Sequence, residues 1–137
     1  MDLPAEGGCL CGTLRYRVLE ELTNAAYCHC RMCQQRSGAP MVTTLDVPVS
    51  GFAFTKGEPA AYQSSPTAHR VFCRDCGTEI YFCPIDDPTG RSLNLGTLDD
   101  PEAVQPRMHI WTDSQLSWLN INDDLPRHGK YPSQGED

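Results

Sequence analysis

The stretch 68–83, AHRVFCRDCGTEIYFC, decides how this chain folds. Two runs rich in apolar and aromatic residues, 68–73 and 79–83, flank the short segment Cys73-Arg74-Asp75-Cys76-Gly77. Runs of this length on either side of a turn predict the two strands of a hairpin. A glycine directly after Cys-x-x-Cys lets the backbone turn so that amides point at the sulfurs. We therefore expect a hairpin whose turn is a metal-binding knuckle.

A second cysteine pair near the start of the chain supplies the missing half of such a site. Cys9 and Cys11 lie two residues apart, so in an extended segment both side chains face the same way. With Cys73 and Cys76 they make four thiolates, the ligand number of a structural zinc. Closing the loop of 73 − 9 = 64 residues costs about 4 kcal/mol, whereas a structural thiolate zinc supplies on the order of 10–16 kcal/mol. The alternative is two unrelated pairs of reduced cysteines.

The third cluster, Cys28-His29-Cys30-Arg31-Met32-Cys33, holds three soft donors within six residues. Three ligands leave the fourth position of a zinc open for water or a substrate thiol, as in catalytic sites. Zinc deprotonates a bound thiol and so makes a positioned nucleophile, for which a small aldehyde is a suitable electrophile. The alternative is a second structural site, closed by a fourth ligand from this set: Cys83, His29, His69 or His109.

The remaining candidate residues carry weaker signals. Cys83 ends the apolar run 80–83 and is expected to pack in the core. His29 is expected to lie behind the ligands or on the surface, and His69 and His109 to pack within strands. Arginines near the clusters either bind a substrate carboxylate or are solvated at the surface; they are Arg31, Arg36 and Arg70.

Length and composition indicate one small, mainly β domain of short antiparallel strands with little helix. The chain has 137 residues, with 11 glycines and 11 prolines, which favours many turns. We expect a single domain, 1–137, with its core at about 7–118, Trp118 capping the core, and a polar tail, 120–137, that frays. One short helix is expected at 31–36. The remaining strands are expected at 13–19, 25–28, 41–47, 52–55, 60–64, 91–95 and 107–112.

Charge and targeting signals narrow the class of partner. A formal net charge of −7 disfavours nucleic acids and anionic membranes. No signal peptide or apolar run of about 20 residues is visible, which indicates a cytoplasmic protein that does not enter a membrane. Thiols stay reduced there, so metal ligation is favoured over a disulfide framework for the eight cysteines. The sequence does not indicate an oligomeric state.

The order of the three clusters resembles a known family. The motifs are Gly8-Cys9-Leu10-Cys11-Gly12, then Cys28 to Cys33, then Phe72-Cys73-Arg74-Asp75-Cys76-Gly77-Thr78, with His109-Ile110 and Trp118 downstream. They are similar to those of the glutathione-dependent formaldehyde-activating enzymes, the family that includes the centromere protein V group. The resemblance runs from about Gly7 to Trp118.

The resemblance implies a zinc-binding β-tent domain with two zinc ions. It implies a structural zinc on Cys9, Cys11, Cys73 and Cys76, and a catalytic zinc on Cys28, Cys30 and Cys33. It also implies a carbon–sulfur lyase activity that joins formaldehyde to glutathione, giving S-(hydroxymethyl)glutathione. A rival interpretation is a non-enzymatic, zinc-stabilised module that binds a protein partner.

Overall fold

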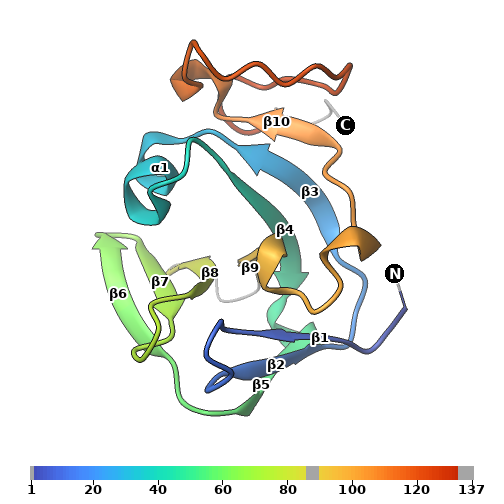
Figure 1. Ribbon diagram of the computed structural model, residues 1–137, viewed down its shortest axis with the longest axis vertical. Coiled ribbons are helices and arrows are strands. Elements are labelled where there is room, and N and C mark those ends of the chain that lie inside the picture. Colours follow the sequence, from blue (N-terminus) through green and yellow to red (C-terminus); the bar gives the residue numbers. More distant parts are fainter. Residues whose placement is uncertain (1, 86–89, 133–137) are drawn as a thin grey trace. The chain divides into compact units, whose positions relative to one another are not determined.

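The computed structural model describes residues 2–85 and 90–132 (Figure 1). Its strands, in chain order, are β1 (Ala5–Gly8), β2 (Arg15–Val18), β3 (Thr23–Cys28), β4 (Val42–Pro48), β5 (Phe52–Lys56), β6 (Ala60–Ser65), β7 (Ala68–Phe72), β8 (Glu79–Pro84), β9 (Gly90–Asn94) and β10 (Met108–Ile110). The described helices are α1 (Arg31–Ser37) and four single 3-10 turns, η1 (Val49–Gly51), η2 (Leu95–Thr97), η3 (Pro101–Ala103) and η4 (Thr112–Ser114). The predicted class, mainly β with short strands and little helix, is confirmed.

The chain divides into two compact units. Unit 1 comprises Met1–Thr23 and Leu45–Val104, and unit 2 comprises Asn24–Thr44 and Gln105–Asp137. Strand β4 contributes residues to both. The prediction of one domain over the whole chain stays a prediction. In the described part of the chain, no helix is long and apolar enough to cross a membrane.

Unit 1 is built from antiparallel strands. Strands β1, β2 and β5 form one sheet in that order and lie side by side in Figure 1. Strands β9, β8, β7 and β6 follow one another in a second sheet, which contains the predicted hairpin of β7 and β8. In β7, the register pairs His69 with Cys83 and Val71 with Tyr81 of β8.

The core of unit 1 follows from alternation along its strands. In β2, Tyr16 and Val18 are fully buried while the arginines between and before them are not, as expected for a strand with one buried face. The Tyr16 ring stacks on Phe52 at 5.0 Å, and its hydroxyl lies 2.8 Å from Thr97 Oγ1. A buried phenol needs such a partner, because an unpaired polar group would cost free energy.

Unit 2 joins β3 to β10, which run parallel and adjacent (Figure 1). The register pairs Ala26 with Met108 and Cys28 with Ile110, so the first cysteine of the triplet lies beside β10. Helix α1 starts at its N-cap Cys30 and ends where Gly38 takes a left-handed conformation, φ 73°, and donates its N–H to Gln34 O at 2.8 Å.

Three features differ from the sequence predictions. Strand β1, AEGG, was not predicted, because it contains no β-branched or aromatic residue. Trp118 was predicted to cap the core, but it is 67% exposed, so that prediction is wrong. Fraying from Asn120 is also wrong for part of the tail, since Pro126 O accepts from His109 N and Lys130 O accepts from Trp111 N. Residues 133–137 lie outside the described chain.

Gly7 offers a test of the packing between β1 and β2. A Cβ at Gly7 would overlap Thr97 O and the phenol oxygen of Tyr16, whereas one at Gly96 would meet no atom within 4 Å. We expect Gly7→Ala to lower the free energy of unfolding by about 1–3 kcal/mol in urea titrations, as overpacking does. The control Gly96→Ala should change it by less than about 0.5 kcal/mol. Equal stabilities would contradict the described packing.

Candidate metal centres

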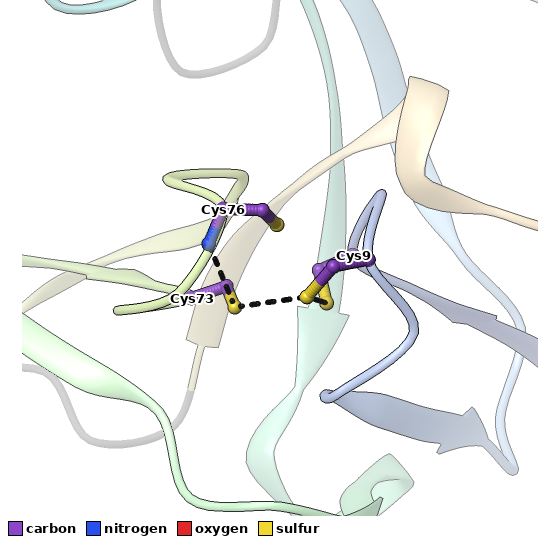
Figure 2. A group of neighbouring side chains, drawn as sticks. Cys9, Cys73 and Cys76 are labelled. Carbon is purple, nitrogen blue, oxygen red and sulfur yellow. Dashed lines mark hydrogen bonds between the residues drawn. The ribbon is translucent and has the colours of Figure 1, made fainter.

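Four cysteines of unit 1 converge. The sulfurs of Cys9, Cys11, Cys73 and Cys76 all lie within 4.8 Å of one another. Cys11 Sγ is 3.6 Å from Cys9 Sγ and 3.8 Å from Cys73 Sγ. A tetrahedral zinc with Zn–S bonds of about 2.3 Å separates its sulfurs by about 3.8 Å. The donor set and its spacing therefore fit one zinc ion. Figure 2 shows the sulfurs of Cys9, Cys73 and Cys76 pointing toward one another.

Backbone turns aim these sulfurs. Leu14 N donates to Cys9 Sγ at 3.2 Å, and Cys76 N donates to Cys73 Sγ at 3.5 Å (Figure 2). Gly77 takes a left-handed conformation, φ 81°, and its N–H donates to Cys73 O at 2.8 Å. Amides that donate to sulfur favour the thiolate, the form in which cysteine binds a metal. The predicted knuckle, with its glycine and inward amides, is what the structure contains.

Thr78 links the two cysteine loops and was not identified from the sequence. Its Oγ1 lies 3.2 Å from Cys76 Sγ and accepts from Leu10 N at 3.1 Å. The Thr78 hydroxyl and backbone hydrogen bonds are the main causes that lower the pKa of Cys76 to about 5. Thr13 Oγ1 is likewise 3.1 Å from Cys11 Sγ. Both threonines stand two residues after a cysteine, and this Cys-x-Thr repeat is the signal that could have revealed them.

Three cysteines of unit 2 form a second group. The sulfurs of Cys28, Cys30 and Cys33 lie within 4.8 Å of one another, with Cys28 Sγ and Cys33 Sγ 3.8 Å apart. Cys28 ends β3, Cys30 caps α1 and accepts from Cys33 N at 3.3 Å, and Cys33 lies in the first turn. The thiols of Cys30 and Cys33, and then burial, raise the pKa of Cys28. Three thiolates this close need a cation between them, so this donor set also fits a metal.

Among the described residues, no fourth cysteine, histidine or carboxylate belongs to this second group. His29 and His109, two of the candidate fourth ligands, hydrogen-bond each other instead, with His29 Nε2 2.9 Å from His109 Nδ1. Cys83 and His69 are cross-strand partners in β8 and β7 and belong to neither cysteine group. The structure thus brings together the predicted four and the predicted three. Their assignment to particular metals stays a prediction.

The histidine between the ligands is part of a buried chain. His29 and His109 are both 0% exposed, so the surface alternative for His29 is wrong. His109 Nε2 lies 2.9 Å from Asp123 Oδ2, its ring stacks on Tyr27, and it meets the His29 ring edge to edge through their hydrogen bond. Burial lowers the pKa of His29 to about 4, so His29 is neutral near neutral pH.

An aromatic pair packs beside the triplet. Trp111 packs against the buried cluster formed by Ala26, Cys28, Cys33 and Ile110. Its backbone is left-handed, φ 59° and ψ 37°, which is rare for a bulky residue and costs about 1–3 kcal/mol. The Tyr131 ring meets the Trp111 ring edge-on at 5.5 Å. Such strain is concentrated at functional sites in proteins.

Arg70, a candidate for binding a substrate carboxylate, is neither solvated nor free. It is buried in β7, with Nη1 3.3 Å from Glu79 Oε1 and the guanidinium 4.9 Å from the centre of the Phe82 ring. A buried ion pair of this kind already supplies the arginine with its anion.

Thr78 provides a test of the four-cysteine group. We expect Thr78→Val to weaken zinc binding there about tenfold, because the bonds from its hydroxyl to Cys76 and from Leu10 disappear. Competition with a chromophoric chelator measures this affinity. The control Thr55→Val removes an exposed threonine of β5 and should change nothing. Equal affinities in the two variants would show that the Thr78 hydroxyl does not support the group.

Comparisons with known proteins agree with the arrangement of cysteines. Residues 4–114 match the family model described as glutathione-dependent formaldehyde-activating enzyme. A curated Schizosaccharomyces pombe protein, described as an uncharacterized lyase, is 30% identical over 77 residues; the match covers 56% of each chain, so this chain spans about half of that relative. A crystal structure of a Rhodobacter sphaeroides protein shares the fold, with a TM-score of 0.57 at 22% identity over 89% of this chain and 98% of that one. The resemblance predicted from the three clusters is confirmed, and the chain belongs to the glutathione-dependent formaldehyde-activating enzyme family.

Proposed function

We propose that this chain joins a thiol, glutathione or a similar one, to formaldehyde or another small aldehyde. Cys28, Cys30 and Cys33 hold a zinc whose fourth position is left for the substrate thiol. The observation that carries this proposal is the contrast between the two groups, one with four convergent sulfurs and one with three and no fourth ligand among the described residues. The family and a relative named as a lyase support it.

The reaction is an addition that balances without an oxidant or reductant. The sulfur–carbon bond forms, the carbonyl π bond breaks, and the thiol proton ends on the oxygen, giving a hydroxymethyl thioether. In reverse, the same steps cleave a carbon–sulfur bond, which is the direction that defines a carbon–sulfur lyase. When bound, zinc lowers the pKa of a coordinated thiol and so supplies the nucleophilic thiolate.

The residues around the triplet keep the open position free. His29, next to two of the three donors, uses Nε2 to hydrogen-bond His109 and is buried, so it is held away from a ligand role. The N–H of Cys33 donates to Cys30 Sγ and fixes that donor at the start of α1. In unit 1, the four-cysteine group would hold the structural zinc, because its four sulfurs, all within 4.8 Å of one another, supply the full number of ligands for such a site.

Zinc content tests the two sites separately. We expect two zinc ions per wild-type chain purified under reducing conditions, and one in Cys30→Ser, because that variant removes one of only three donors. The matched control is Cys83→Ser, which changes a cysteine outside both groups and should keep two. Elemental analysis with circular dichroism gives the metal count and the fold. One zinc in the wild type and in Cys30→Ser alike would contradict a metal at the triplet.

Exchange spectroscopy tests the chemistry. Glutathione and formaldehyde also combine without an enzyme at a measurable rate. The test is therefore whether the protein raises the rate at which the adduct exchanges with free glutathione and formaldehyde at equilibrium, above the uncatalysed rate. We expect two-dimensional exchange NMR to show acceleration by the wild type and by Cys83→Ser, and at least a tenfold loss in Cys30→Ser, since the nucleophile is no longer activated. A fully zinc-loaded wild type that accelerates nothing would favour the partner-binding module instead.

A further inference from the structure

His29 is held at three points. It stands between two sulfur donors, Cys28 and Cys30. Its N–H donates to Ile110 O at 3.0 Å, and its carbonyl accepts from Gln34 Nε2 at 2.9 Å. Its ring nitrogen Nε2 lies 2.9 Å from His109 Nδ1. The backbone of His29, which separates Cys28 from Cys30, is therefore held by β10 and by α1. The His29 ring is held by the side chain of His109.

The third of these points depends on Asp123. An ionised carboxylate only accepts hydrogen bonds, so His109 must carry its proton on Nε2, where Asp123 Oδ2 is 2.9 Å away. In the neutral form of His109, Nδ1 is then an acceptor, and His29 donates to it from Nε2. His29 Nδ1 is left without a proton, and it is buried with no hydrogen-bond partner among the residues that the structure describes. One carboxylate thus sets the proton order in both rings.

The hydrogen bonds around His109 also explain why the polar segment after Asn120 is ordered. Around His109, Pro126 O accepts from its N–H at 2.9 Å, and its carbonyl accepts from His128 N at 2.9 Å. These bonds hold the polar segment along β10 and bring the Asp123 carboxylate to a fully buried ring. Asp124, the next residue, makes no such contact among the described residues.

We propose that His109 and Asp123 are positioning residues for the triplet, fixing His29 so that the sulfurs of Cys28 and Cys30 are placed before the metal arrives. The inference rests on the proposed function, in that it takes the triplet as a metal site. The physical reason is entropic, because ordering a residue's backbone and side chain costs free energy. When the site is ordered before the metal binds, that cost does not reduce the metal affinity. Partners behind metal ligands change affinity by about 10–100-fold.

Metal affinity of the triplet, in the full chain, is the direct test. Co²⁺ is titrated into protein whose four-cysteine group is already filled with zinc, and the cobalt–thiolate absorption of the triplet is followed. We expect affinity to fall about tenfold in Asp123→Ala and in His109→Phe. His109→Phe keeps an aromatic ring stacked on Tyr27. The matched controls, Asp124→Ala and His69→Phe, should leave the affinity unchanged.

Two further measurements separate positioning from simple packing. Long-range ¹H–¹⁵N correlation spectra of the wild type should show both rings protonated at Nε2 only, and Asp123→Ala should change this order. The double variant His29→Phe/His109→Phe leaves no buried imidazole unpaired, so it should recover stability relative to His109→Phe without recovering cobalt affinity.

The outcomes discriminate between the two proposals. Equal cobalt affinity in Asp123→Ala and Asp124→Ala, a proton on His29 Nδ1, or full recovery of affinity in the double variant would each overturn the positioning role alone. A wild-type triplet that takes up neither zinc nor cobalt would overturn the proposed function, and this inference with it. The positioning role is supported if cobalt affinity falls only in variants of His109 and Asp123 and the proton order of the rings changes in Asp123→Ala.

Discussion

The convergence of four sulfurs is the constraint on which unit 1 depends. The turn after β1 brings Cys9 and Cys11, and the turn between β7 and β8 brings Cys73 and Cys76, to within 4.8 Å of one another. Closing so long a loop costs about 4 kcal/mol. Hydrogen bonds between neutral thiols are weak, so they do not offset that cost. A structural zinc would supply on the order of 10–16 kcal/mol, which is enough to offset it. The turns at the ends of these strands therefore place four sulfurs at the spacing of a metal site. The amides and hydroxyls around them hydrogen-bond the same sulfurs.

Local patterns in the sequence predicted what local chemistry controls. Both sides of the cysteine knuckle became β7 and β8, because β-branched and aromatic residues favour strands. The segment from Arg31, which contains Cys33, became α1, and it ends at the predicted stop before Gly38. Strand β1 was not predicted, because the residues AEGG do not favour a strand by themselves. Its extended conformation comes from pairing with β2. Thr13 and Thr78 were not identified because their spacing, two residues after a cysteine, does not by itself show that the hydroxyl turns back to the sulfur.

Long-range pairing accounts for what the sequence did not reveal in unit 2. His29 and His109 are 80 residues apart, and they meet because β10 lies parallel to β3, a pairing that no local signal specifies. The segment from Asn120 is polar and contains proline and glycine, which is also the composition of a frayed tail. Its order comes from backbone bonds to β10 and from the contact of Asp123 with a buried histidine. A polar sequence can therefore be ordered when its acceptors satisfy donors that are already buried.

The two cysteine groups differ in what surrounds them, and this difference bears on function. Around the four-cysteine group, Thr13, Thr78 and backbone amides bond directly to sulfur, which stabilises thiolates in a complete shell. Around the triplet, support reaches the donors from behind, through the backbone and ring of His29, while a strained Trp111 packs at the side. A complete shell needs only to hold its metal. An incomplete shell must hold its metal and also keep a position free, so its ordering has to come from groups that do not themselves become ligands.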